Sequence, residues 1–186
     1  LFIPYLRRYF IDKPNIRSSH VIPKPRAGGM VFVFVIIFLS FFIGNYQFLI
    51  YVPLAIIGFL DDLIGMPKFI RYLFQLFTVI ILMINSPIYI LGLNNLTFIW
   101  FYIFIVFLII LGTSIINFTN FMDGSDGIVA GSMILIFIFC SILITDDYLI
   151  VAGALLGFLF WNWSPSKVFM GDIGSTFLGA LLVGLI

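Results

Sequence analysis

The chain alternates long, uncharged apolar runs with short polar segments. Residues 30–43, 96–116 and 128–144 contain no charged side chain. In hydrocarbon every backbone polar group must be bonded within the protein, which favours helices of about 20 residues. The pattern therefore predicts an all-α, polytopic transmembrane helical bundle, with spans near residues 1–6, 30–43, 48–60, 72–84, 96–116, 128–144, 148–161 and 176–186.

The connection between the second and third predicted spans has two interpretations. Each span is shorter than about 20 residues, so residues 30–60 could form one long tilted helix. The turn-prone segment 44–47, Gly-Asn-Tyr-Gln, favours a hairpin instead. With the hairpin, all nine Lys and Arg residues fall on one side of the membrane. We therefore predict a hairpin whose basic side is cytoplasmic, as the positive-inside rule requires.

Composition excludes a soluble domain. The chain is 63% hydrophobic and 9% charged, with a mean hydropathy of +1.25, whereas soluble domains carry about 25% charged residues. We expect a single integral membrane domain over residues 1–186, in contact with the lipid bilayer. The sequence opens on Leu1 and stops at Ile186 inside an apolar run, so we expect a fragment of a longer protein. The net charge of +1 says little about partners, and we expect no nucleic acid among them.

The acidic residues are the first candidates for chemistry. All eight are aspartates, and six of them fall on the basic side. Asp61 and Asp62 are adjacent at the end of a predicted span, where their charges repel each other unless a cation neutralises them. The pair is therefore either a solvated helix end or a metal or general-base site.

The segment 117–127, Asn-Phe-Thr-Asn-Phe-Met-Asp-Gly-Ser-Asp-Gly, is more specific. Asn120, Asp123 and Asp126 recur at a spacing of three, which places them on one face of a helical turn. Such an oxygen-rich column suits Mg²⁺, which takes one or two carboxylates together with phosphate oxygens. The alternative is a plain polar loop between two spans.

A third cluster lies at 169–175, Phe-Met-Gly-Asp-Ile-Gly-Ser. It joins Asp172 to glycines at a helix start, where free N–H groups favour an anion. An ordinary capped helix start is the alternative. Asn162, just after the preceding span, adds an amide that we expect on the same face.

The polar segment 17–29 supplies cations. It contains the only histidine, His20, together with Lys24 and Arg26. Arg binds phosphate through paired N–H groups and Lys acts as a point charge. These residues either bind phosphate or anchor the loop to the cytoplasmic face. Three aspartate clusters and a basic loop on one face predict phosphoryl transfer at the membrane interface. An ion-coupled membrane transporter and a structural membrane protein are the alternatives.

These blocks resemble the signature motifs of the polyprenyl-phosphate N-acetylhexosamine-1-phosphate transferases, a part of glycosyltransferase family 4. The resemblance rests on Gly-Phe-Leu-Asp-Asp at 58–62, on the segments 117–127 and 169–175, and on the first-loop pattern from His20 to Gly29. It implies a polytopic protein of about ten spans, dimeric in many members. Such enzymes transfer a sugar 1-phosphate from a UDP-N-acetylhexosamine to undecaprenyl phosphate and release UMP, with Mg²⁺ or Mn²⁺ as cofactor.

The resemblance also implies roles for individual residues. Asp172 would bind the metal with Asn120 near it. Asp61 would be the base that deprotonates the lipid phosphate, with Asp62 beside it. The nucleotide-sugar pocket would be lined by Asp123, Asp126, Asn162 and Phe169, with Phe169 stacked on the uracil. The catalytic carboxylates would be Asp61, Asp62 and Asp123.

The first loop departs from the family pattern, because Lys24 stands where a threonine is usual. Its Pro25-Arg26 pair favours the enzymes that initiate lipopolysaccharide O-antigen, common antigen, capsule or teichoic acid over the peptidoglycan enzyme. We therefore expect a bacterial inner-membrane, multi-pass glycosyltransferase of cell-wall or envelope biogenesis, with UDP-N-acetylglucosamine as donor and a cytoplasmic active site.

Overall fold

The structure, a computed structural model, describes residues 3–12 and 23–186. Its helices and strands follow in chain order: α1 (Ile3–Tyr9), β1 (Ile11–Asp12), β2 (Lys24–Pro25), α2 (Gly29–Phe42), the 3₁₀ helix η1 (Gln47–Tyr51), α3 (Val52–Ile64), α4 (Lys68–Ile84), α5 (Pro87–Asn95), α6 (Phe98–Met122), α7 (Ile128–Leu143), α8 (Tyr148–Asn162) and α9 (Gly171–Val183). The strands form one short antiparallel ladder, with Ile11 opposite Pro25 and Asp12 opposite Lys24. The predicted all-α class is confirmed.

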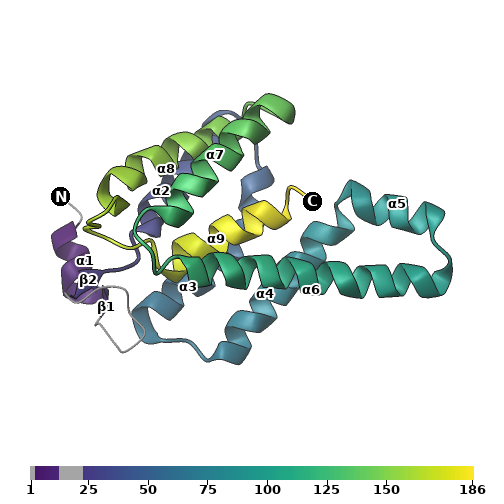
Figure 1. The fold of residues 1–186 in the computed structure, drawn as a ribbon, viewed down its shortest axis with the longest axis horizontal. Helices are drawn as coiled ribbons and strands as arrows, with labels where there is room; N and C mark the ends of the chain where they lie inside the picture. Colours follow the sequence, from purple (N-terminus) through teal and green to yellow (C-terminus); the bar gives the residue numbers. More distant parts are fainter. Residues whose placement is uncertain (1–2, 13–22) are drawn as a thin grey trace.

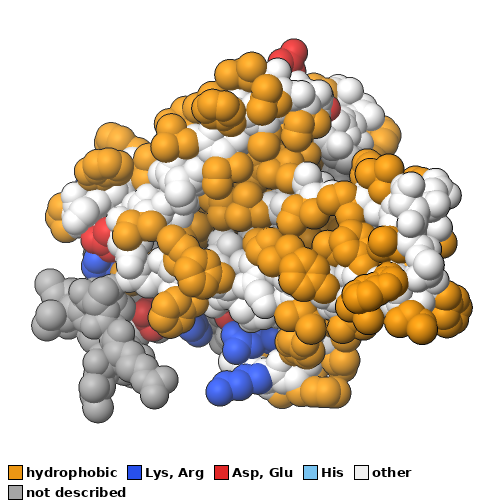
Figure 2. All heavy atoms as spheres, turned by 45° about the vertical axis from the view of Figure 1, so that its right-hand side comes forward, with side chains coloured by type: hydrophobic (Ala, Val, Ile, Leu, Met, Phe, Trp, Pro, Cys, Tyr) orange, Lys and Arg blue, Asp and Glu red, His pale blue; other side chains and the backbone are white. Residues whose placement is uncertain are grey.

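Among residues 3–12 and 23–186, two helical segments are long and apolar enough to cross a membrane, Gln47–Ile64 and Phe98–Met122. A third candidate is the pair α4 and α5, which bends by 66° at its break. Helices α2, α7, α8 and α9 are apolar but shorter. Figure 2 shows a face covered largely by hydrophobic side chains, with Lys and Arg side chains gathered toward its lower edge. This surface fits a lipid environment.

Helix α9 is the centre of the bundle, and all but two of its residues are buried. Helices α2, α3 and α6 pack around it, as Figure 1 shows. Helix α3 approaches α9 closely at Gly58, where a β-carbon would lie 2.6 Å from the carbonyl oxygen of Asp172. Glycine at this position therefore allows two backbones to touch beside the aspartates.

The predicted hairpin at residues 44–47 is confirmed. At one end, the N–H of Gly29 donates to the carbonyl of Met170, and the N–H of Ile173 donates to Asp62. The start of α2 and the end of α3 therefore both meet the start of α9. At the other end, Asn45 donates to Asp147 in the turn between α7 and α8.

Three boundaries differ from the predicted spans. Helix α5 occupies residues that lie between the predicted spans 72–84 and 96–116. Ser86 caps this helix by accepting a bond from the N–H of Tyr89, and Pro87 begins it. Helix α6 continues through Asn117 and Asn120 to Met122, and α9 begins at Gly171 rather than near 176. The amides do not end α6, because their side chains bond to residues of neighbouring helices.

Candidate active site

Two aspartates from different helices converge on one arginine. Arg71 Nη1, at the start of α4, donates to Asp61 Oδ2 at 2.5 Å and to Asp172 Oδ2 at 2.7 Å. Asp61 lies in the last turn of α3, where it also accepts a bond from the N–H of Met66. Asp172 lies in the first turn of α9. The packing of α3 on α9 therefore brings the segment 58–62 and the segment 169–175 together at Arg71.

The segment 117–127 joins the same site through Asn120, which bonds Asp172. Its Nδ2 donates to Asp172 Oδ1 at 2.8 Å and to Ser175 Oγ at 3.1 Å. Asn120 is in the last turn of α6, and it bonds the oxygen of Asp172 that Arg71 does not bond. The three blocks that the sequence singled out are therefore in contact.

Asp62 has a different environment from its neighbour Asp61. Its side chain is 1% exposed, whereas that of Asp61 is 11% exposed. Asp62 Oδ2 accepts a bond from the N–H of Ile173, and its Oδ1 lies 3.7 Å from Arg26 Nε. Arg26 also donates to the carbonyl of Asp62. Asp62 thus joins the first loop to α3 and α9, while Asp61 is the more accessible carboxylate.

The first loop is hydrogen-bonded directly to the segment 169–175. The N–H of Phe169 donates to the carbonyl of Pro25, and the N–H groups of Gly28 and Gly29 donate to the carbonyls of Phe169 and Met170. Ala27, between these bonds, is buried and has a φ of 64°. A left-handed conformation is unfavourable for alanine, so the surrounding bonds must hold the loop in this shape.

Asp123 and Asp126 follow α6 and leave its helical face. The helix ends at Met122, so the predicted column continues in a turn rather than on one helix. Asp123 accepts a bond from the N–H of Gly171 at 2.9 Å. Burial among the surrounding atoms raises the pKa of the Asp123 carboxyl well above its ordinary value.

Asp126 belongs to a separate cluster with Lys24 and Ser166. Lys24 Nζ lies 3.3 Å from Asp126 Oδ1 and donates to Ser166 Oγ at 2.7 Å. Ser166 donates to Asp126 through both its N–H and its hydroxyl. Partial burial opposes ionisation of Asp126, but the bonds from Ser166 and Lys24 outweigh it and lower the pKa of Asp126.

The remaining candidate residues are placed less favourably for direct contact with a substrate. Phe169 is 5% exposed, and Lys24 Nζ lies 4.9 Å from the centroid of its ring. A base that stacks on this face must therefore displace Lys24. Asn162 is buried, and it bonds to the N–H of Gly127 and the carbonyl of Val168, so it connects two loops. His20 lies outside the described residues.

Sequence reasoning assigned no role at the site to Arg71 or Ser166. Arg71 was interpreted only as a basic residue of the cytoplasmic side. Its position three residues after Lys68, at a helix start, is the one signal that pointed to a shared face. Ser166 carried no local signal, because its bonds to Asp126 span 40 residues of sequence.

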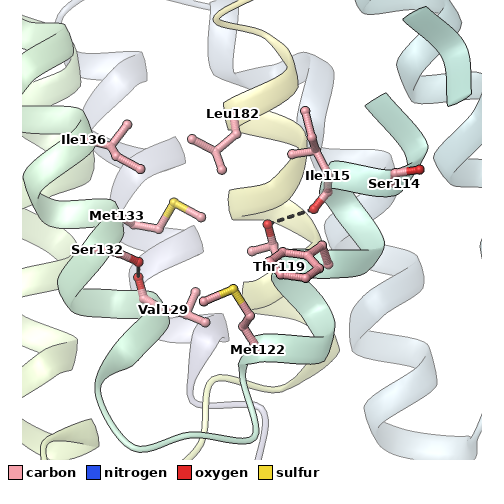
Figure 3. Close-up of a pocket in the computed structure, with 10 residues that line it drawn as sticks. Ser114, Ile115, Thr119, Met122, Val129, Ser132, Met133, Ile136 and Leu182 are labelled. Carbon is pink, nitrogen blue, oxygen red and sulfur yellow. Dashed lines mark hydrogen bonds between the residues drawn. The ribbon is translucent and has the colours of Figure 1, made fainter. Parts of the chain in front are cut away.

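Two of the cavities among the described residues border α6 and differ in character. A cavity of about 250 Å³ between α3, α4, α6 and α9 is lined by Lys68, Arg71, Asn120 and Asp172 among others. A larger cavity of about 460 Å³ lies between α6, α7 and α9 (Figure 3). Its hydroxyls at Thr119 and Ser132 donate to carbonyls of their own helices, so its wall is apolar.

The donor set fits a magnesium ion that is completed by substrate. Asp172 brings a carboxylate and Asn120 an amide to the same place, and Asp61 brings a second carboxylate that Arg71 links to Asp172. Within residues 3–12 and 23–186, no three His, Cys, Asp or Glu side chains are grouped as ligands. Magnesium commonly uses one or two carboxylates and takes its other ligands from phosphate and water.

Comparison with known proteins points to one family. Residues 45–186 match the model of glycosyl transferase family 4. The chain is 33% identical to a phospho-N-acetylmuramoyl-pentapeptide-transferase of Oceanobacillus iheyensis, over the whole chain and 69% of that protein. It is 32% identical to an undecaprenyl-phosphate alpha-N-acetylglucosaminyl 1-phosphate transferase of Thermotoga maritima, over 93% of the chain and 55% of that protein. The chain thus spans between about half and two thirds of the length of these relatives.

Proposed function

We propose, because this chain belongs to glycosyl transferase family 4, that the complete protein transfers an N-acetylhexosamine 1-phosphate from a UDP-sugar to undecaprenyl phosphate. The convergence of Asp61, Asp172 and Asn120 from three sequence blocks carries this proposal. The names of the two relatives describe transfers of the same kind that differ in the sugar phosphate transferred. Bacterial inner membrane is the corresponding location, with the aspartates on the cytoplasmic side.

The proposed reaction gives each described residue a distinct part. Asp172 would hold Mg²⁺ together with substrate oxygens, and Asn120 fixes its carboxylate. When bound, the metal offsets phosphate charge. Asp61 accepts the proton of the lipid phosphate, and its greater exposure than Asp62 supports this assignment. Asp62 holds the first loop in place through Arg26.

We assign the donor nucleotide to the separate cluster formed by Lys24, Asp126 and Ser166. When a uracil takes the place of Lys24 over the ring of Phe169, the displaced ammonium group, the carboxylate of Asp126 and the hydroxyl of Ser166 lie next to it. These groups complement the carbonyl and imide edges of a uracil. Asp123 connects this side to the start of α9 through Gly171.

UDP-N-acetylglucosamine is the proposed donor, and the polymer is an envelope polysaccharide such as O-antigen. The Pro25-Arg26 form of the first loop supports this choice over UDP-N-acetylmuramoyl-pentapeptide. The identities of 32% and 33% to relatives of both kinds do not separate them. A panel of UDP-sugars offered to the same membranes distinguishes the two donors.

The deciding experiment measures UMP release by membranes that contain the complete protein. The mixture holds undecaprenyl phosphate, Mg²⁺ and UDP-N-acetylglucosamine, and the control is Asp172→Ala. Release that disappears in the control supports the transferase. Solute flux without bond cleavage, and no release with any UDP-N-acetylhexosamine, would instead support an ion-coupled transporter.

A further inference from the structure

The polar cavity between α3, α4, α6 and α9 contains two cations that the proposed reaction has not yet used. Lys68 and Arg71 lie one turn apart at the start of α4, and both line the cavity. The side chain of Arg71 is 32% exposed, and Lys68 is exposed. Both cations are therefore accessible to a ligand that enters this space.

The other polar groups of the cavity are already bonded to one another. Gln75 Nε2 donates to Asn117 Oδ1 at 3.2 Å, and Asn117 Nδ2 donates back to Gln75 Oε1 at 2.8 Å. Asn120 is used by Asp172 and Ser175. The amides are thus occupied, and the carboxylate of Asp172, which also lines the cavity, is bonded to Asn120 and Arg71. The positive charge offered to a ligand comes from Lys68 and from the edge of Arg71 that faces away from Asp172.

The orientation of Arg71 leaves one edge of its guanidinium for a ligand. Its Nη1 makes both bonds to the carboxylates of Asp61 and Asp172. Its Nε and Nη2 have no hydrogen-bond partner in the part of the chain that the structure describes. A guanidinium held in this way presents the N–H geometry that binds a phosphate through two parallel bonds.

The surroundings indicate a phosphate that is attached to a hydrocarbon. The residues beside the two cations on α4 are exposed and apolar: Phe69 is 70% exposed and Leu73 is 43% exposed. Leu54 and Ile57 form the apolar wall of the cavity itself. A head group that enters from the lipid phase therefore passes over apolar surface before it meets the cations. The apolar cavity in Figure 3 offers no charged side chain for this purpose.

We propose that Lys68 and Arg71 clamp the terminal phosphate of the lipid acceptor in this cavity, next to Asp61. The inference rests on the proposed function and assigns its acceptor side. An oxygen of the clamped phosphate attacks the phosphorus that bears the sugar. A new P–O bond forms there, and the bond from that phosphorus to the bridging oxygen of the diphosphate breaks. UMP leaves with the bridging oxygen and its electron pair, and the acceptor's proton goes to Asp61.

The test compares Lys68→Gln with Lys167→Gln in the complete protein. Lys167 has the same charge, is exposed, lies against the ring of Trp161 and lines no part of this cavity. Loss of one charge-assisted contact is expected to raise the KM for polyprenyl phosphate about tenfold in Lys68→Gln. The KM for the UDP-sugar stays within about twofold, and Lys167→Gln changes neither. Arg71→Lys, which keeps the charge but not the paired N–H groups, is expected to raise the same KM.

The outcomes distinguish the phosphate of the lipid acceptor from the diphosphate of the UDP-sugar. A rise in the KM for the UDP-sugar instead would mean that the cavity holds the donor diphosphate, and no change in either KM would mean that it holds no phosphate. Both results overturn the clamp. Equilibrium binding of radiolabelled decaprenyl phosphate to the purified protein tests the clamp without turnover. A protein that binds this lipid through Lys68 but transfers no sugar phosphate would refute the proposed function and leave the clamp standing.

Discussion

Gly171 stands where the first loop, Asp62 and α9 meet, and its replacement by alanine tests this arrangement. Its φ is 74°, a left-handed conformation that costs alanine about 1–2 kcal/mol. A β-carbon would also lie 2.5 Å from Asp62 Oδ2 and 2.6 Å from the N of Ala27. Because ordinary carbon contacts begin near about 3.5 Å, the carboxylate or the loop must move by roughly 1 Å.

The expected loss follows from that displacement. Moving Asp62 breaks its bond from the N–H of Ile173, which costs about 1–3 kcal/mol for a buried group. With the backbone strain, Gly171→Ala should lower the free energy of unfolding by about 2–5 kcal/mol. A displacement of about 1 Å near the reacting groups should lower turnover about 100-fold.

The assay pairs UMP release with thermal unfolding in detergent. Gly131→Ala is the matched control, because Gly131 is inside α7 and a β-carbon there meets nothing within 4 Å. The control should keep its turnover and gain up to about 1 kcal/mol from helix propensity. If Gly171→Ala unfolds and turns over like the control, the described contact between the first loop, Asp62 and α9 is wrong.

Three further predictions concern single groups. Asp61→Asn should lower turnover at least about 100-fold, because it removes the proposed general base. Asp62→Asn should mainly lower thermal stability. Near-normal turnover of Asp61→Asn would exclude Asp61 as the base. Lys24→Met should raise the KM for the UDP-sugar several-fold and leave the KM for the lipid unchanged, since Lys24 bonds Ser166 and Asp126; a shift in the lipid KM alone would contradict the donor assignment. Chelation with EDTA should abolish UMP release and added Mg²⁺ or Mn²⁺ should restore it, while full activity in excess EDTA would refute the metal proposal.

Much of the candidate site could be predicted from the sequence. The spacing of Asn120 and Asp123 marked a polar cluster, and both residues contact the start of α9. The adjacent Asp61 and Asp62 pointed to an ionic site at a helix end, and both accept bonds at the site. These signals are local, because several polar groups beside an apolar run are costly unless they have partners.

The different environments of Asp61 and Asp62 could not be predicted from the sequence. Asp61 and Asp62 are neighbours in sequence, yet one is bonded to Arg71 and the other is enclosed by Arg26 and Ile173. Successive residues of a helix point in different directions, so the rotation of α3 against α9 decides which carboxylate is accessible. That rotation depends on the close approach at Gly58.

The sequence by itself determined the membrane class, the hairpin at residues 44–47 and the presence of three polar blocks, because long apolar runs and clustered polar residues act through local transfer energies. Only the tertiary structure decided that Arg71 joins Asp61 to Asp172, and that Lys24 lies against Phe169. Arg71 and Asp172 are 101 residues apart, and no local rule selects that pair. The packing of α3, α4 and α6 around α9 brings them together, and it depends on the shapes of whole helix faces.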